Sequence, residues 1–406
     1  MSKFLFVLDI SFDKGGPSVH LLQDVMRCAL NKGHDVYVVL KKTDSPSPVV
    51  PEEFSSNSSF QYRYIEEKRA SKQGFLKRYL YSIHYARLCK KRYKNWASFD
   101  AVFLQSCTNA AFYLNGLKKL HCPIVFNVQD IFPYNLHLSG QLPFDRIAFP
   151  VFGFLQRKAY KSVDRIITIS EDMKKTLADD GVDAKKINVI YNWSYADDLI
   201  SASGIRNNDY FDLGSNPSSF NIVYAGNIGR MQNVEIVIQA AAMTRNDPRI
   251  HFYVIGGGAN KDAVEKLAEG LTNITFLPMQ ESRFAESIYS QADLNVIPLV
   301  NGGIKTALPS KTATCLRVDN QVVFCIEAES LFAKEIEKYK NVHICSPNDA
   351  SELRDLILRL AAHKASSVKN KTDETALAFV KEKMSSAKNP AEYIETMENV
   401  GKRIIQ

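Results

Sequence analysis

A lysine that follows a strand and a glycine loop is the feature of this sequence that most directly suggests chemistry. Residues 294–299 have the apolar composition of a strand, Gly302 and Gly303 lie in the loop after it, and Pro309-Ser310-Lys311 comes next. Glycines let backbone N–H groups approach oxygen atoms, and a lysine ammonium is a compact charge that suits phosphate. The pattern predicts an anion site near Gly303 and Lys311, although most loops of this kind are only turns.

Other glycines follow other predicted strands, and they support the same interpretation. They are Gly15 and Gly16 after residues 3–9, Gly226 and Gly229 after 220–224, and Gly256, Gly257 and Gly258 after 250–255. Ligands of doubly wound sheets bind beyond the carboxyl ends of the strands. Glycines at several such ends favour a phosphorylated ligand over a set of unrelated turns.

The elements that must position these residues alternate between strand and helix. Short apolar runs separated by helical segments predict parallel βαβ units. We expect strands at 3–9, 35–41, 101–105, 124–128, 165–169, 220–224, 250–255, 273–277 and 293–297, and helices at 18–31, 233–244, 260–269 and 282–291. The fold class is therefore α/β.

The alternation stops once, in a polar segment rich in turn residues, and starts again at Phe220. Such a segment is typical of a linker. We expect two doubly wound, Rossmann-like domains at 1–198 and 220–380, with a linker at 199–219 and a cleft between the domains.

Composition and charge narrow the class of protein. The chain has 406 residues, of which 45% are hydrophobic and 23% charged, and its net charge is +7. The seven cysteines form no C-x-x-C pair or His/Cys cluster, which argues against structural zinc. No signal peptide or bilayer-spanning segment is apparent, so we expect a cytosolic or peripherally attached protein.

A basic stretch at 68–94 contains no acidic residue, and apolar residues interleave at roughly helical spacing. A basic amphipathic helix can dock on an anionic membrane, and it can equally be a solvated helix that packs on its own domain. Nucleic acid is a third partner, but no recognisable binding module is present, so none is expected. The residues predicted to dock on the membrane are Lys77, Arg78, Lys90, Lys91 and Arg92.

Several segments, in this order and spacing, resemble the retaining glycosyltransferases of family four, which have the GT-B fold. The segments are Asp9 to Leu40 with its Gly-Gly, His20 and Lys-Gly-His-Asp-Val run, Asp164 to Glu171, Ile187 to Trp193, Tyr224 to Asn233, Val254 to Gly258, Ala292 to Leu299, and Pro309 to Lys311. Tyr224-Ala225-Gly226-Asn227-Ile228-Gly229 is similar to a variant found in bacterial surface-polysaccharide transferases, among them those that handle N-acetylated amino sugars.

The resemblance implies a nucleotide-sugar donor, with UDP as the favoured carrier, and a lipid-linked glycan acceptor. Arg230 and Lys311 would neutralise the diphosphate, and Asp130 would contact the donor sugar or an acceptor hydroxyl; these three are the catalytic candidates. The donor-binding candidates are Gly15, Gly16, Gly226, Asn227, Arg230, Gln232, Gly257, Met279, Gly303, Thr306, Ser310, Lys311 and Thr314. The N-terminal domain would take the acceptor, and 381–406 would return to it as a helix.

No Asp-x-Asp motif occurs in the chain. Glycosyltransferases that bridge the diphosphate with a divalent metal need such a carboxylate pair, so we expect fixed cations to act instead, with neither a metal nor another cofactor. The family's usual pair of glutamates corresponds to Thr306 and Thr314 here. Its usual Ala, Gly and Pro farther on correspond to Arg317, Asp319 and Gln321. Threonine can bind hydroxyls, but without the strength of a charged acceptor.

Three functions remain compatible with the sequence. The first is a hexosyl- or N-acetylhexosaminyl-type transferase that extends a lipid-linked bacterial glycan in the cytoplasm, on the inner face of the plasma membrane. The second is a degenerate GT-B subunit that supports a catalytic transferase partner. The third is a GT-B enzyme of another reaction, such as an epimerase, which would need an acidic pair that we cannot place. Binding of nucleotides and nucleotide sugars would distinguish these functions.

Overall fold

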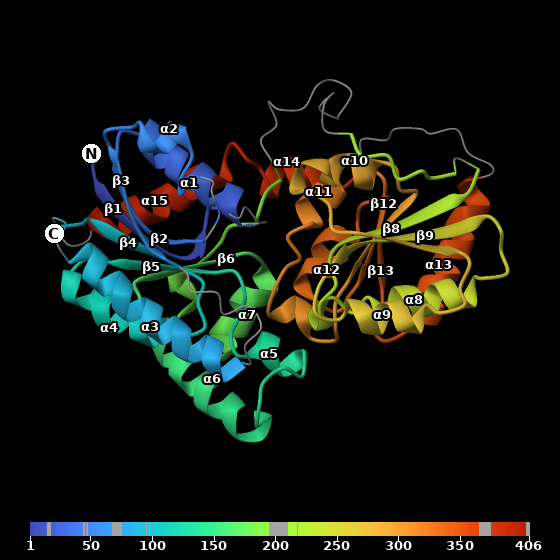
Figure 1. Ribbon diagram of the computed structural model, residues 1–406, viewed down its shortest axis with the longest axis horizontal. Coiled ribbons are helices and arrows are strands. Elements are labelled where there is room, and N and C mark those ends of the chain that lie inside the picture. The colour runs from blue at the N-terminus through green and yellow to red at the C-terminus, as the bar shows by residue number, and fades with distance from the viewer. Residues whose placement is uncertain are drawn as a thin grey trace. The chain divides into compact units, whose positions relative to one another are not determined.

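The computed structural model (Figure 1) describes residues 1–13, 18–43, 45, 48–66, 75–94, 96, 98–194, 210–216, 218–364 and 375–402. The chain divides into two units, which are described separately. Unit 1 comprises Met1–Asn192 with Ser386–Gln406, and unit 2 comprises Trp193–Ser385. No helix among the described residues is both long enough and apolar enough to cross a membrane.

Unit 1 contains a seven-stranded sheet in the order β3-β2-β1-β4-β5-β6-β7, and every described pair of strands is parallel. The strands are β1 (Lys3–Ser11), β2 (Asp35–Lys42), β3 (Phe60–Glu66), β4 (Ala101–Gln105), β5 (Ile124–Val128), β6 (Arg165–Thr168) and β7 (Ile187–Val189). The central strands β4 and β5 are buried throughout, as expected for a sheet covered on both faces.

The helices of unit 1 cover both faces of this sheet. They are α1 (Val19–Asn31), α2 (Glu52–Ser55), α3 (Phe75–Tyr93), α4 (Ala110–Leu117), α5 (Tyr134–Leu138), α6 (Asp145–Lys161), α7 (Glu171–Asp179) and the last helix of the chain, α15 (Asn389–Gly401). In Figure 1, α3, α4 and α6 lie side by side, and α15 packs against α1 and β4. Residues from both ends of the chain thus build one core.

Unit 2 contains a six-stranded parallel sheet in the order β10-β9-β8-β11-β12-β13. The strands are β8 (Phe220–Asn227), β9 (Ile250–Gly257), β10 (Ile274–Leu277), β11 (Leu294–Pro298), β12 (Gln321–Cys325) and β13 (Val342–Cys345). The helices are α8 (Glu235–Met243), α9 (Lys261–Leu267), α10 (Ala285–Ser290), α11 (Thr312–Arg317), α12 (Leu331–Ile336), α13 (Ala350–Lys364) and α14 (Leu377–Lys383).

Both units are therefore doubly wound α/β domains, as predicted from the alternation of apolar runs. The restart of the alternation at Phe220 coincides with the start of β8. Residues 199–209 and 217 of the predicted linker lie outside the described residues.

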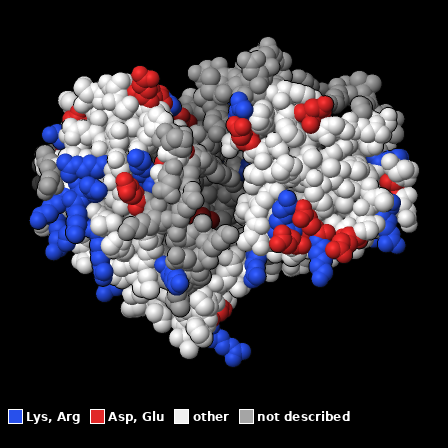
Figure 2. Space-filling view, in the orientation of Figure 1, with Lys and Arg blue, Asp and Glu red and all other residues white. Residues whose placement is uncertain are grey.

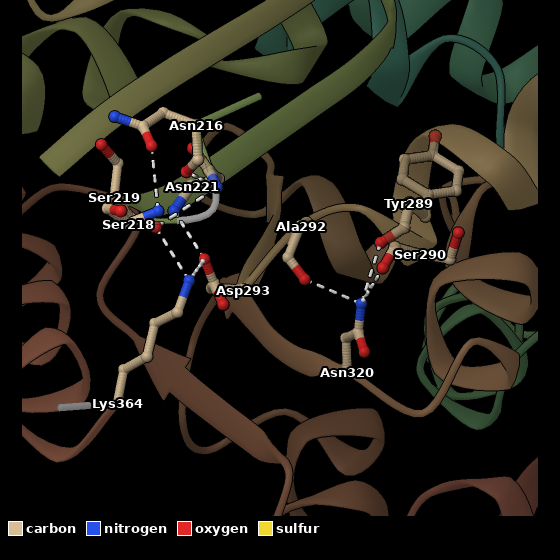
Figure 3. Close-up of polar contacts among 10 residues, drawn as sticks. All are labelled: Asn216, Ser218, Ser219, Asn221, Tyr289, Ser290, Ala292, Asp293, Asn320 and Lys364. Carbon is tan, nitrogen blue, oxygen red and sulfur yellow. Dashed lines mark hydrogen bonds and ion pairs between the residues drawn. The ribbon is translucent and has the colours of Figure 1, made fainter. Parts of the chain in front are cut away.

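Polar contacts hold the amino-terminal edge of the sheet in unit 2 (Figure 3). The Lys364 ammonium lies 2.6 Å from the Asp293 carboxylate and donates to the Ser219 carbonyl at 2.8 Å. The Asn320 side-chain amide donates to the carbonyls of Tyr289, Ser290 and Ala292 at the end of α10. These groups satisfy polar backbone groups at the ends of helices and strands, so this edge is structural.

Candidate functional site

The carboxyl edge of the unit 2 sheet has a topological switch point between β8 and β11. From β8 the chain continues to β9 and β10 on one side, whereas from β11 it continues to β12 and β13 on the other. Ligands of open α/β sheets bind where the order of the strands reverses in this way. Arg230 follows β8 and Lys311 follows β11, so the two predicted cations come from the two loops that flank the switch point.

Lys311 is the central residue of this edge. It directly precedes α11, and its Nζ is buried and makes no hydrogen bond with any residue that the structure describes. The nitrogen lies 3.6 Å from the centre of the Tyr224 ring, and Tyr224 is itself fully buried in β8. The Tyr224 hydroxyl is already used, because it donates to the Asn227 carbonyl at 2.5 Å.

The surroundings of Lys311 oppose its charge. Desolvation by burial lowers the pKa of Lys311 from 10.5 to about 7. The π face of Tyr224 stabilises the cation, but typically by only about 0.5–2 kcal/mol. A buried ammonium without a hydrogen-bond acceptor is costly to a folded protein, whereas an anionic ligand would offset that cost with both charge and acceptor oxygens.

The backbone of β8 closes tightly on this lysine. Gly226 has a φ of +137°, and a Cβ there would lie 3.2 Å from the Lys311 Nζ. At the neighbouring Gly256, with a φ of +155°, a Cβ would lie 1.9 Å from the Gly226 carbonyl oxygen. Gly256 is therefore required by the close approach of β8 and β9, whereas Gly226 is favoured by its positive φ and leaves the space that Lys311 fills.

The loop after β8 presents one free cation and one pair of amides. Arg230 is exposed and makes no hydrogen bond or ion pair with any described residue. The Asn227 amide donates to the Gln232 side-chain oxygen at 3.1 Å, directly over Gly229. Arg230 can therefore turn toward a ligand at no cost in lost contacts, whereas Asn227 and Gln232 already bind each other.

The loop after β11 is fixed to its neighbours through its backbone. Val300 donates its N–H to the Met231 carbonyl at 3.0 Å, next to Arg230. Gly302, with a φ of +80°, donates its N–H to the Glu327 carboxylate. A Cβ at Gly303 would lie 3.2 Å from that of Leu299. The loops after β8, β11 and β12 thus form one connected edge around the switch point.

Glu327 lies at this edge too, and the sequence analysis did not single it out. It is buried just beyond β12, and its second carboxylate oxygen has no hydrogen-bond partner among the described residues. A single glutamate after an apolar strand has no distinctive signal in a sequence. Only its tertiary contact with Gly302 places it here.

Threonines occupy the two positions that correspond to the family's usual glutamates, and other residues replace its usual glycine and alanine. Thr306 is buried, and its hydroxyl donates to the Gly303 carbonyl at 3.1 Å. Thr314 is half-buried on α11. Asp319, at the position of the usual glycine, has a φ of +61°, a conformation that aspartate tolerates better than most residues. At the position of the usual alanine, the Nε of Arg317 lies 3.5 Å from the Oε1 of Glu286.

The remaining donor-binding candidates are less constrained. Met279 and Ser310 are exposed, and a Cβ at Gly257 would meet no atom within 4 Å. These three residues leave room for a ligand and stay predictions. Gly15 and Gly16 lie outside the described residues.

Asp130 belongs to unit 1 and follows β5. Burial of its carboxyl group raises the pKa of Asp130 to about 6, although the residue as a whole is exposed. The side chains before it are engaged: Asn127 donates to Gln105 at 2.9 Å, and Gln129 donates to Asn127 at 3.1 Å. Of this polar segment, Asp130 is thus the group that remains for a substrate, and its role stays a prediction.

Of the predicted membrane-docking residues, Lys77, Lys90, Lys91 and Arg92 are exposed on α3, and the side chain of Arg78 lies outside the described set. Within the described residues, no three His, Cys, Asp or Glu side chains are grouped so that they could hold a metal ion.

Comparison with known families gives two matches that follow each other along the chain. Residues 15–193 match glycosyltransferase family 4, and residues 219–363 match the glycosyl transferases group 1 domain. The boundary between the two matches falls where the structure passes from unit 1 to unit 2.

Two curated proteins are similar over most of their length. WcaI of Escherichia coli (strain K12), named for glycosyl transfer in colanic acid biosynthesis, is 27% identical over 79% of this chain and 82% of its own. WbjE of Pseudomonas aeruginosa, named as a glycosyltransferase, is 26% identical over 71% of this chain and 73% of its own.

Solved structures share the fold. The crystal structure of Anabaena Alr3699/HepE in complex with UDP and glucose has a TM-score of 0.63 and 15% identity, and the match covers 98% of this chain and 100% of that one. With its two parallel-sheet domains and both family matches, this chain is a glycosyltransferase of the GT-B type, built from a glycosyltransferase family 4 domain and a group 1 domain.

Proposed function

We propose that this glycosyltransferase moves one sugar from a nucleotide-sugar donor, with UDP as the favoured carrier, to a growing lipid-linked bacterial polysaccharide. The observation that carries the proposal is the buried ammonium of Lys311 at the switch point of unit 2, for which the described part of the chain supplies no hydrogen-bond partner. A diphosphate offers the charge and the acceptor oxygens that this group lacks. The structural neighbour that was solved with UDP and glucose supports a donor of this class.

In this proposal the chemistry depends on stabilising the leaving group. As the bond between the sugar and the diphosphate breaks, negative charge grows on the phosphate oxygens. Lys311, which is held in place by burial, and Arg230, which turns toward the ligand, stabilise that charge. Because two side-chain cations do this work, we propose that transfer needs no metal ion.

We further propose that the anomeric configuration of the sugar is retained. The departing phosphate helps to deprotonate the acceptor hydroxyl on the same face of the sugar. Asp130 of unit 1 binds a hydroxyl of the donor sugar or of the acceptor. The acceptor lies at an anionic membrane, on which the exposed bases of α3 dock the protein at the inner face of the plasma membrane.

The test is a thermal-shift panel of nucleotides and nucleotide sugars on the intact chain and on the Lys311→Ala variant. We expect one nucleotide family to stabilise the intact chain, and its sugar conjugate to be hydrolysed slowly. Losing one charge-assisted hydrogen bond typically costs about 1.5–3 kcal/mol, so the variant should bind at least about tenfold more weakly. A folded protein that responds to no nucleotide would instead support the degenerate subunit.

A further inference from the structure

Helix α6 exposes a continuous apolar stripe, which we define as Ile147, Val151, Phe154 and Leu155, with Phe144 just before the helix. Their exposed fractions are 71%, 53%, 62% and 39%, and that of Phe144 is 80%. Positions 147, 151, 154 and 155 follow the helical period, so they share one face. Large apolar side chains that gather in one exposed patch mark an interaction surface.

The stripe is additional to the face by which α6 belongs to its own domain. The packed face includes Gly153, Gln156, Ala159 and Tyr160. The Tyr160 ring lies 5.6 Å from that of Phe126 in β5. A helix that is apolar on two sides, with only one of them buried, lacks a partner for the second.

Neighbouring helices extend the apolar surface. α4 packs against both α3 and α6, and the Tyr79 ring of α3 lies 5.0 Å from that of Phe152 in α6. Next to Tyr79, Leu80 is 64% exposed, and Phe112 of α4 is 40% exposed. Three adjacent helices therefore contribute large apolar side chains to the surface of unit 1.

Charges around the stripe identify its partner. Exposed bases stand at both ends of α6: Arg146 at the start, and Lys158 and Lys161 at the end. Across the sequences of α3, α4 and α6 the sole acidic residue is Asp145, whose carboxylate lies 2.7 Å from the His137 ring. Figure 2 shows Lys and Arg on the flank of unit 1, and uncharged atoms beside a basic side chain at the tip where α6 begins.

We propose that the α6 stripe inserts into the headgroup and acyl boundary of an anionic membrane, while the bases of α3 and of the ends of α6 bind the headgroups. An apolar face between cationic edges is the pattern of a helix that lies in a membrane interface. A second copy of this chain would bring the same basic surface against itself. The evidence for the surface is independent of catalysis, but its purpose rests on the proposed lipid-linked acceptor.

Salt separates the two contributions. Attraction between α3 and headgroups is screened at high ionic strength, whereas insertion of apolar side chains is not. The test is co-sedimentation of the full chain with phosphatidylcholine vesicles that contain phosphatidylglycerol. It is done at about 0.1 M and about 1 M salt, where charges are screened over about 10 Å and about 3 Å. The intact chain should lose part of its binding at high salt and keep the rest.

Three variants show which side chains provide the salt-resistant and the salt-sensitive parts of vesicle binding. Ile147→Ser with Val151→Ser and Phe154→Ser should lower the salt-resistant partition coefficient at least about thirtyfold, since each side chain loses most of its apolar area. Replacing Lys77, Lys90 and Lys91 with glutamine should remove only the salt-sensitive part. The matched control, Met243→Ser with Leu267→Ser, changes side chains of unit 2 that are 48% and 47% exposed and should bind like the intact chain.

A spectroscopic probe reports insertion itself. The emission of Phe154→Trp should shift to the blue on anionic vesicles and be quenched by brominated acyl chains, and that of Leu267→Trp should not. A serine variant that binds at high salt like the intact chain would overturn the proposal. So would a dimer of the intact chain that the serine variant abolishes, because the stripe would then be a subunit interface.

Nucleotide binding, measured without lipid, keeps this inference separate from the proposed function. If the serine variant binds nucleotide normally but leaves the vesicles, both stand. If neither the intact chain nor the serine variant binds nucleotide while the vesicle results hold, the proposed function fails and the membrane surface remains.

Discussion

Binding of a diphosphate nucleotide should take up a proton, and Lys311 should be the group that binds it. Desolvation lowers the pKa of this lysine to about 7, so half of the molecules carry a neutral Lys311 near neutral pH. A bound diphosphate favours the charged form and returns the pKa toward its ordinary value. Proton uptake should therefore be about 0.5 per nucleotide at pH 7 and about 0.9 at pH 8, and the affinity should fall by about fivefold from pH 7 to pH 8 and by nearly tenfold per pH unit above that.

The assay is titration calorimetry with UDP, or with whichever diphosphate nucleotide binds, in buffers of different ionisation enthalpy at pH 7 and pH 8. The slope of the observed heat against ionisation enthalpy gives the number of protons. Lys311→Ala should abolish the uptake. Arg230→Ala should bind more weakly with the uptake unchanged, because a guanidinium does not release its proton in this range. Uptake near zero at pH 8 in the intact chain, or uptake that persists in Lys311→Ala, would refute the reasoning.

The remaining predictions concern stability, geometry and turnover. Lys311→Met should raise Tm below pH 7 while weakening nucleotide binding at least about tenfold, because at about 1.4 kcal/mol per pKa unit the shift from 10.5 to about 7 limits the cost of the buried charge to about 5 kcal/mol. The folded-state pKa of Lys311 lies below its unfolded-state value, so the charged lysine destabilises the intact chain below about pH 7 and this cost disappears as the pH rises toward 10.5. The stability advantage of Lys311→Met over the intact chain should therefore shrink with rising pH across that range. Gly226→Ala should cost about 1–3 kcal/mol in denaturant unfolding and displace Lys311, whereas Gly257→Ala, with open space around it, should leave stability unchanged. Transfer should persist in EDTA, and loss with rescue by magnesium or manganese would show that fixed cations are insufficient. The transfer rate should rise through a pH near 6 as Asp130 ionises, and the rise should be absent in Asp130→Asn if that carboxylate contacts substrate.

The fold was predictable because buried parallel strands are continuous apolar runs. Strands β4 and β5 begin and end where the sequence analysis placed them. The edge strand β3 was missed, because only its residues Phe60 and Ile65 are buried, Tyr62 and Tyr64 are exposed, and it adjoins a serine-rich stretch. The four-residue α2 is too short for a helical period to show.

The candidate site was predictable only in part. The strand, glycine and lysine pattern identified Lys311, but its burial against Tyr224 and its shifted pKa arise from packing between β8 and α11. Glu327 is placed by a contact with Gly302 across two loops, which no local pattern reports. The α6 stripe was overlooked because its apolar residues look like core residues until the structure shows which of them are buried.

The most direct test of the central claim is sugar transfer by the purified full chain. Each nucleotide sugar of a panel is incubated with lipid-linked acceptors extracted from polysaccharide-producing bacteria, and the masses of the products are measured by mass spectrometry. We predict that one donor adds the mass of a single hexose or N-acetylhexosamine to an acceptor, that the nucleotide is released in equal amount, and that Lys311→Ala does neither. Failure of every donor to extend any acceptor, by a folded protein that binds the nucleotide, would contradict the proposed transfer.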